Sequence, residues 1–107
     1  MRVFISGPYS EPDHMTNVKA AIKAADLVVA VGHMPFIPHL YHLWDQISPH
    51  DYDYWMDLCF KWLTECDVLI RLDGYSEGAD QEVVLARRLN IPIYYGINQF
   101  LDDPSCA

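Results

Sequence analysis

Short apolar runs and longer amphipathic segments alternate along the whole of this chain. Four runs have the length and composition of buried strands, and three helical segments with apolar faces separate them. An order of β-α-β-α-β-α-β favours a parallel sheet with right-handed crossovers. We therefore predict an α/β fold, specifically a flavodoxin-like doubly wound parallel sheet of four or five strands. The expected strands are residues 2–6, 34–38, 67–72 and 91–95, and the expected helices run from about 15 or 16 to 31, 54 to 65 and 79 to 89.

The loops that follow the first three strands are expected on one edge of the sheet. Sheets of this class bind ligands at the carboxyl ends of their strands, and these loops comprise residues 7–13, 38 onward and 73–78. Prolines in the second run place it at an edge, because proline cannot donate a ladder hydrogen bond. Residues 39–53 are expected as a long connection, and residues 96–107 show no firm pattern.

Size and charge limit the classes of function. A chain of 107 residues has room for one core, so residues 1–107 are expected to form a single domain. The net charge of −8 argues against a nucleic acid polymer as partner, although not against a small nucleotide. No apolar run reaches the roughly 20 residues that span a membrane. Three cysteines without a disulfide pattern, and the lack of a signal peptide, favour the cytoplasm.

The segment after the third strand carries the densest group of polar residues. Ser76, Gly78, Asp80 and Glu82 lie where the strand is followed by a helix. A hydroxyl, a flexible backbone and free helix N–H groups suit an anion such as phosphate, and Glu82 would hold a carboxylate beside it. The alternatives are structural: Ser76 as a helix N-cap, and Glu82 as an acid that complements the helix dipole.

Four sequence elements together resemble the nucleoside 2-deoxyribosyltransferase superfamily. They are Ile5-Ser-Gly-Pro-Tyr, Pro35-Phe-Ile-Pro-His, Trp62-Leu-Thr-Glu-Cys-Asp and Ser76-x-Gly-Ala-x-x-Glu. The superfamily includes the 2′-deoxynucleoside 5′-phosphate N-hydrolases and short, uncharacterised, often phage-associated members, which this chain resembles most. The resemblance covers residues 1–95. It implies N-glycosidic bond cleavage or deoxyribosyl transfer on a 2′-deoxynucleoside or its 5′-monophosphate, with Glu82 as the nucleophile and no cofactor.

Cleavage of the N-glycosidic bond calls on a second carboxyl group as a proton donor. A carboxylate below the sugar traps the oxocarbenium-like state, while another acid protonates the departing base. The catalytic candidates are Glu82 as nucleophile, with Asp80, Asp57 or Asp73 as the acid. The resemblance also implies an acid in the helix before the third strand. That position falls near Cys59, and Asp57 is the nearest carboxylate.

The substrate-binding candidates come from the three loops on the ligand edge. The monophosphate-specific branch of the superfamily uses a Ser at the spacing of Ser76, together with a Ser and an Arg in the first loop. Here that loop contains Ser10 and no Arg, which leaves phosphate specificity open. Tyr9 stacks on a base or lines the sugar in one interpretation, and caps the sheet edge in the other. The predicted binding residues are Gly7, Pro8, Tyr9, Ser10, His39, Ser76 and Gly78.

A His-x-x-His-x-x-Asp pattern formed by His39, His42 and Asp45 has the spacing of one helical face, which suits a metal. No fourth ligand is evident, so no metal is expected. His39 is interpreted instead as a ligand contact at the end of the second strand, and His42 as a surface or packing residue.

An aromatic-rich stretch lies in the same connection and contains Trp44, Tyr52, Tyr54 and Trp55. These rings either form a wall over a base or pack the connection onto the core or onto a second subunit. Because so small a core absorbs little further apolar surface, we expect a homodimer or larger homo-oligomer with Trp44, Tyr52 or Trp55 near the interface.

A second class of function remains open, a non-catalytic nucleotide-binding or sensing module on the same fold. Glu82 favours the enzyme. The missing Arg of the first loop and the displaced acid near Cys59 favour the binding module.

Overall fold

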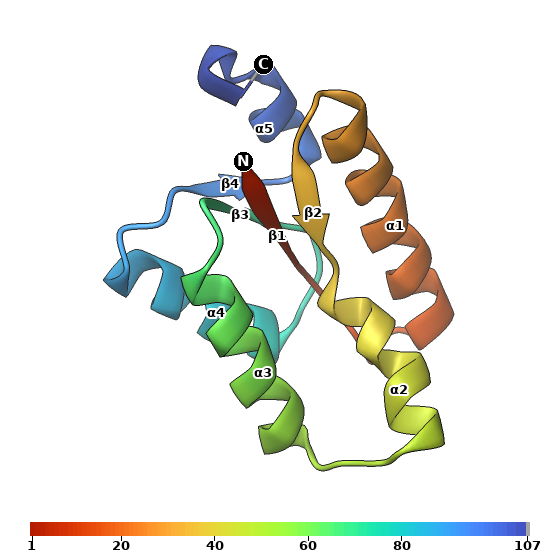
Figure 1. Ribbon diagram of the computed structural model, residues 1–107. Coiled ribbons are helices and arrows are strands. Elements are labelled where there is room, and N and C mark those ends of the chain that lie inside the picture. The colour runs from red at the N-terminus through yellow and green to blue at the C-terminus, as the bar shows by residue number, and fades with distance from the viewer. Residues whose placement is uncertain (107) are drawn as a thin grey trace.

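Four parallel strands form the centre of the protein in a computed structural model that describes residues 1–106 (Figure 1). The strands are β1 (Arg2–Ser6), β2 (Met34–Phe36), β3 (Val68–Arg71) and β4 (Ile93–Tyr95), in the order β2-β1-β3-β4. This arrangement confirms the predicted α/β fold and places the proline-containing strand at an edge. The two central strands are the buried ones, and Phe4 of β1 pairs with Phe36 on one side and Leu69 on the other.

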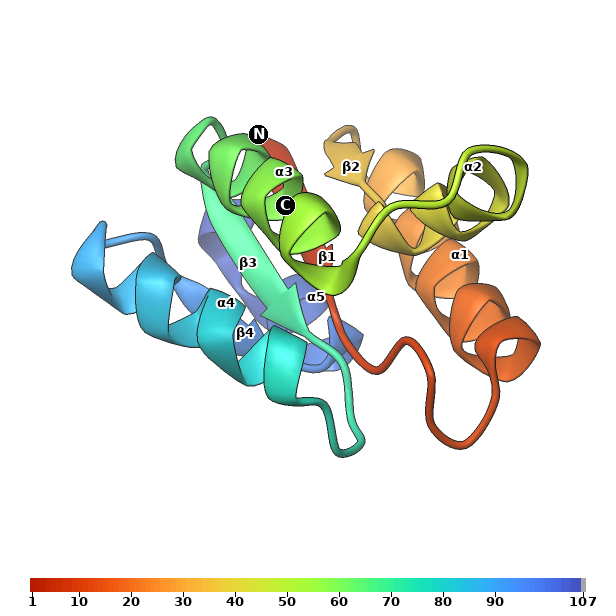
Figure 2. The ribbon, with the colours of Figure 1, turned by 90° about the horizontal axis from the view of Figure 1, so that it is seen from below.

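Helices cover both faces of the sheet (Figure 2). α1 and α5 pack on one face, while α3 and α4 pack on the other. α2 lies beyond the sheet, at the end where the strands finish (Figure 1). The helices are α1 (His14–Ala30), α2 (Tyr41–Ile47), α3 (Tyr52–Thr64), α4 (Glu77–Arg88) and α5 (Ile97–Asp102), with short 3-10 helices at Pro38–Leu40 and Pro104–Cys106.

The alternation of side chains along β1 divides the core into two halves. Val3 and Ile5 point toward α1 and α5, and Phe4 points toward α3 and α4. Ser6 therefore falls on the same side as Phe4. The first half of the core contains Val3, Ile5, Ala21, Val28, Val68, Ile70 and Phe100. The second half contains Phe4, Cys59, Leu63, Cys66, Leu69, Val83 and Ala86.

Two segments contain more regular structure than their sequence predicts. The connection 39–53 includes α2, and the C-terminal segment includes α5. Phe100 is fully buried, so packing against the sheet rather than helix propensity orders α5. α3 and α4 each begin two residues earlier than expected, because Asp51 and Ser76 act as N-caps that accept hydrogen bonds from the backbone N–H groups of Tyr54 and Ala79.

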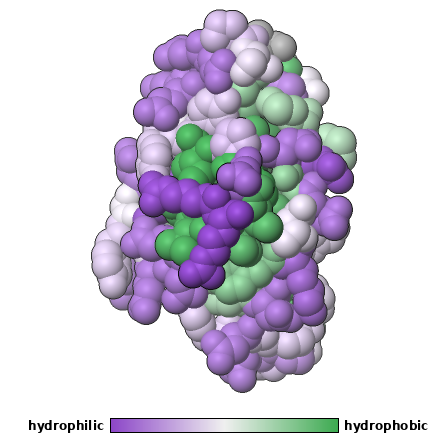
Figure 3. Space-filling view, turned by 90° about the vertical axis from the view of Figure 1, so that its left-hand side faces the viewer, coloured by the Kyte–Doolittle hydropathy of each residue, from purple (hydrophilic) through white to green (hydrophobic). Residues whose placement is uncertain are grey.

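The side of the molecule that carries α4 and β4 exposes apolar atoms between strongly hydrophilic side chains (Figure 3). Val84 of α4 and Leu89, the C-cap residue of that helix, are exposed apolar residues. Within residues 1–106, none of the helices combines the length and the hydropathy that crossing a membrane requires.

The loop between β3 and α4 depends on a close approach of two backbones. Gly74 has φ +113, and a Cβ there would lie 2.7 Å from Cγ of Pro8. Gly32 has φ +91 with nothing within 4 Å of such a Cβ. Both positions resist a side chain through their backbone conformation, and only Gly74 adds a steric conflict with the loop after β1.

We predict that Gly74→Ala lowers the free energy of unfolding by about 1–3 kcal/mol more than Gly32→Ala, because only the former adds overpacking to left-handed strain. Urea unfolding of the two variants and the wild type measures the difference. Equal losses would show that the loop moves aside without cost.

Candidate active site at the carboxyl ends of the strands

A cavity of about 420 Å³ opens where β1, β2 and β3 end. Figure 2 looks onto this edge of the sheet. Its volume lies in the range of pockets that take small molecules. The structure brings seven of the predicted residues to its wall, while the buried Pro8 lies outside the lining. The seven are Gly7, Tyr9, Ser10, His39, Ser76, Gly78 and Glu82.

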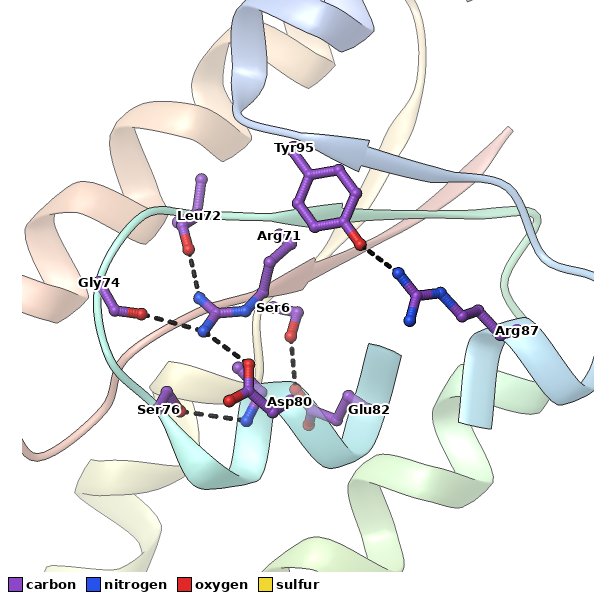
Figure 4. Close-up of polar contacts among 10 residues, drawn as sticks. Ser6, Arg71, Leu72, Gly74, Ser76, Asp80, Glu82, Arg87 and Tyr95 are labelled. Atoms are coloured by element: carbon purple, nitrogen blue, oxygen red, sulfur yellow. Dashed lines mark hydrogen bonds and ion pairs between the residues drawn. The ribbon is translucent and has the colours of Figure 1, made fainter. Parts of the chain in front are cut away.

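Glu82 is the buried carboxyl group of this cavity, with 5% of its surface exposed. It is the sixth residue of α4, two positions further along the helix than the predicted start at residue 79 implies. The Ser6 hydroxyl donates to its Oε1 at 2.7 Å (Figure 4). No side chain or backbone N–H of residues 1–106 donates to Oε2.

The environment of Glu82 tunes its ionisation. Burial raises its pKa to about 7, and the hydrogen bond from Ser6 and the charge of Arg71 both oppose that rise. Both protonation states are therefore populated near neutral pH. This is the range in which a carboxyl group serves as a base or a nucleophile.

Ser6 and Arg71 act on Glu82 and are absent from the predicted site residues, although Ser6 belongs to the Ile5-Ser-Gly-Pro-Tyr element. They are the last residues of β1 and β3 and are paired in register. The alternation of side chains along the two strands predicts which face of the sheet these residues occupy. Each lies two residues beyond an apolar residue, Phe4 or Leu69, whose side chain faces α3 and α4, and side chains two apart in a strand share a face.

Arg71 explains why Asp80 is not in the cavity. The buried guanidinium donates to the carbonyl groups of Leu72 and Gly74 and forms an ion pair with Asp80 at 3.1 Å (Figure 4). Asp80, Asp73 and Arg71 line a second, shallower hollow. Glu82 and Asp80 are two residues apart on a helix and point to different sides, which separates the two carboxyl groups.

Asp57 also lies outside the cavity. Its exposed carboxylate pairs with Lys61 at 2.9 Å, one helical turn away on the outer side of α3. Cys59, two residues further along, lines the cavity instead. Burial and the neighbouring Glu82 raise the pKa of the Cys59 thiol to about 12, so this thiol stays protonated. None of the predicted partner acids is therefore brought to Glu82.

Ser76 and Gly78 shape the cavity wall at the start of α4. The Ser76 hydroxyl accepts a hydrogen bond from the Ala79 N–H at 3.1 Å, which is the capping role, and the residue also lines the cavity. A Cβ on Gly78 would lie 3.1 Å from the Tyr52 hydroxyl and 3.3 Å from Sδ of Met56. Gly78 thus allows α3 and α4 to approach closely and places a phenol over the helix start.

Tyr9 and His39 fix the loop after β1. The Tyr9 hydroxyl and Nδ1 of His42 are hydrogen-bonded at 2.6 Å, and the Tyr9 ring packs against His14. His39 is 3% exposed and donates from Nε2 to the carbonyl of Pro8 at 3.0 Å. Burial lowers the pKa of His39, which keeps the imidazole neutral. Within residues 1–106 its Nδ1 finds no hydrogen-bond partner.

The His-x-x-His-x-x-Asp pattern does not converge. Asp45 accepts hydrogen bonds from the His50 backbone N–H at 3.0 Å and from the Trp55 indole at 2.8 Å, whereas His39 and His42 contact the loop after β1. Nowhere in residues 1–106 are three His, Cys, Asp or Glu side chains grouped so that they could hold a metal ion.

The rest of the cavity wall is aromatic and acidic. The aromatic members are Tyr9, Tyr41, Tyr52, Trp55 and Tyr75. The charged members are Glu11, Asp45, Glu77 and Glu82, and none of the lining residues, all within the described part of the chain, is Lys or Arg. Trp44 and Tyr54 lie behind the wall and pack edge-on against Trp55.

Comparison with solved structures places this fold. The 2-deoxyribosyltransferase of the psychrotolerant bacterium Bacillus psychrosaccharolyticus matches with a TM-score of 0.59 and 17% identity, over 87% of this chain and 69% of that chain. The protein therefore has the nucleoside deoxyribosyltransferase fold. Residues 1–96 match the family described as "Domain of unknown function (DUF7768)", and the chain belongs to that family. Comparison with curated proteins gives no match.

We predict a pH-dependent effect of Glu82→Gln on stability. The folded-state pKa of Glu82, about 7, lies above the ordinary glutamate value of 4.5, so the unfolded chain releases this proton first. Ionisation of Glu82 then lowers the free energy of unfolding as pH rises from about 4.5 to about 7. Glu82→Gln cannot ionise at this position and so keeps its free energy of unfolding. The free energy of unfolding of the variant relative to the wild type should therefore rise by about 2–4 kcal/mol across that range.

Urea unfolding at a series of pH values measures this difference. Glu65→Gln, a change at an exposed carboxylate away from the cavity, serves as the matched control and should show no such growth. If the difference in free energy of unfolding between Glu82→Gln and the wild type does not change with pH, the raised pKa of Glu82 is contradicted.

We predict that Ser6→Ala raises the pKa of Glu82 by about one pH unit, because the ionised carboxylate loses its only side-chain donor. Carbon-13 NMR of labelled glutamate side chains follows this titration directly. Ser6→Cys, which keeps the shape and a weak donor, should fall between Ser6→Ala and the wild type. An unchanged pKa of Glu82 in Ser6→Ala would show that the hydrogen bond from Ser6 does not influence its ionisation.

Proposed function

We propose that the protein cleaves the N-glycosidic bond of a nucleoside, with Glu82 as the nucleophile. One observation carries this proposal: a buried carboxyl group with a pKa near 7 forms the wall of a cavity of about 420 Å³ at the ligand-binding edge of the sheet. The fold shared with a 2-deoxyribosyltransferase supports deoxyribose as the sugar.

The proposed reaction proceeds in two steps. Oε2 of Glu82 attacks C1′ while Ser6 holds Oε1, and the electron pair of the breaking C1′–N bond passes to the base. The glycosyl ester then reacts with water or with a second base at C1′. The carboxylate leaves with the ester electron pair, and the proton of the attacking group passes to solvent. This order is that of a retaining glycosidase.

A 2′-deoxynucleoside suits the cavity better than its 5′-monophosphate. The aromatic wall offers stacking surfaces for a base, and Tyr9 and Ser76 offer hydroxyl groups for a sugar. Phosphate would need cationic partners, and the lining supplies four acidic residues with no Lys or Arg among the described side chains.

A non-catalytic nucleotide-binding module is the second candidate. The placement of Asp57 and Asp80 outside the cavity favours it, since a neutral base departs slowly without an acid.

Self-association and location stay predictions. The exposed rings of Trp44 and Tyr52 offer surface for a homodimer or larger assembly, with the half-buried Trp55 beside them. The three cysteines are free and buried, which suits a reducing cytoplasm.

We predict that Glu82→Gln abolishes base release without loss of the fold. Loss of a covalent nucleophile costs several orders of magnitude in rate, about 4–8 kcal/mol of barrier. The assay incubates the protein with deoxynucleosides and their monophosphates, with and without an acceptor base, and separates released base by chromatography.

Glu65→Gln, the same chemical change outside the cavity, should keep wild-type activity. Equal rates for the wild type and Glu82→Gln would overturn the mechanism. Tight binding of nucleotides without any cleavage by the wild type would establish the binding module instead.

A further inference from the structure

The cavity has the electrostatics of a site for a cation. Its charged lining residues are Glu11, Asp45, Glu77 and Glu82, and within the described residues no Lys or Arg joins them. The field of these carboxylates reaches the other lining groups. Burial and, to a smaller extent, the charge of Asp45 raise the pKa of Tyr9, and burial followed by the charges of Glu77 and Glu82 raises that of Tyr52.

Aromatic faces complete this environment. Tyr41 and Trp55 lie with ring centroids 5.2 Å apart, and the Trp55 indole donates to Asp45 at 2.8 Å, so an aromatic pair is joined directly to a carboxylate. Tyr52 of α3 also lines the cavity, with its hydroxyl beside Gly78 at the start of α4. Aromatic rings beside carboxylates bind organic cations through the ring quadrupole and through charge attraction.

Among the described residues, none of the acids predicted to protonate a departing base lies in this cavity. Asp57 and Asp80 lie outside it. The pKa of Cys59 is about 12, so its thiol is a weak acid. Asp45 is held ionised, because hydrogen bonds from the His50 backbone and the Trp55 indole lower its pKa.

The two histidines that line the cavity do not donate a proton to a base bound inside it. His39 is neutral and donates its only N–H to the Pro8 carbonyl. His50 is exposed, and its ring lies flat on Tyr54 with centroids 3.8 Å apart. Glu11 and Glu77 are exposed carboxylates.

We propose that the preferred substrates of this site are nucleosides whose base already carries a positive charge, such as N-glycosylpyridinium or N7-alkylpurine nucleosides. This inference rests on the proposed cleavage by Glu82. It explains both the acidic and aromatic wall and the missing acid. A cationic base binds to such a wall, and it leaves without taking up a proton.

The chemical step balances without an external acid. An Oε2 electron pair of the Glu82 carboxylate forms the bond to C1′, and the C1′–N bond breaks with its electron pair moving onto the cationic ring. The ring becomes neutral and departs. Water then attacks C1′, the carboxylate leaves with the ester electron pair, and the proton of water passes to solvent. A cation in the cavity also favours the ionised form of Glu82 that attacks.

The test uses nucleoside pairs that differ in charge and little else. The first pair is 7-methyl-2′-deoxyguanosine and 2′-deoxyguanosine, and the second is nicotinamide riboside and its reduced, neutral dihydro form. Base release by the wild-type chain is measured by chromatography. Each kcat/KM is divided by the uncatalysed rate in the same buffer, because cationic nucleosides are intrinsically more labile. Calorimetry with the inactive Glu82→Gln variant measures binding separately.

We expect the cationic member of each pair to show a normalised kcat/KM and an affinity that are at least about tenfold higher. Glu77→Gln should weaken binding of the cation about threefold more than binding of the neutral member, since it removes one charge of the wall. Glu65→Gln is the matched control outside the cavity and should change neither.

Equal normalised rates and affinities within each pair, with base still released, would overturn this inference and leave the proposed function standing. An unchanged preference for the cationic nucleoside in Glu77→Gln would also contradict the inference. Failure of the wild type to cleave any nucleoside in the panel would overturn the proposed function and this inference with it.

Discussion

The hydrogen bond from Ser6 to Glu82 joins the end of the central strand to α4 at the wall of the cavity. Burying a carboxyl group without partners is costly, and a single hydroxyl donor offsets that cost only in part. The remaining penalty is expressed as a pKa of about 7. The reactivity that we assign to Glu82 is thus a consequence of where β1 ends and of which face its last side chain takes.

The loops after β1 and β3 approach closely at two glycines, whose lack of a side chain leaves room for Leu72 and Pro8. A Cβ on Gly7 would lie 2.9 Å from Cβ of Leu72, and Gly74 meets Pro8 as closely. These contacts hold the loops after β1 and β3 together beneath the cavity. His39 adds a hydrogen bond to the same Pro8 from the end of β2, so the three loops form one connected support.

The site departs from the pattern that the family resemblance implies. The resemblance places an acid in the helix before β3, and the residue that lines the cavity from that helix is Cys59, whose thiol is too weak an acid to replace it. Arg71 draws Asp80 to the far side of α4. Carboxylates from the loop after β1, from α2 and from the start of α4, together with aromatic rings, make up the remaining wall. The positively charged leaving group that we propose would reconcile this composition with Glu82 as the proposed nucleophile.

Periodicity in the sequence determined the order of strands and helices, the parallel sheet, the edge position of β2 and the ligand-binding edge, because each follows from local patterns of apolar residues and prolines. The polar segment after the third strand and the family resemblance singled out Glu82, Ser76 and Tyr9. The partners of these residues were decided by the tertiary structure. Ser6 and Glu82 are 76 residues apart, and only the packing of α4 on β1 brings them into contact. Asp57 and Asp80 were plausible acids in the sequence, and the rotation of their helices, fixed by the core on the other side, turned both away from the cavity.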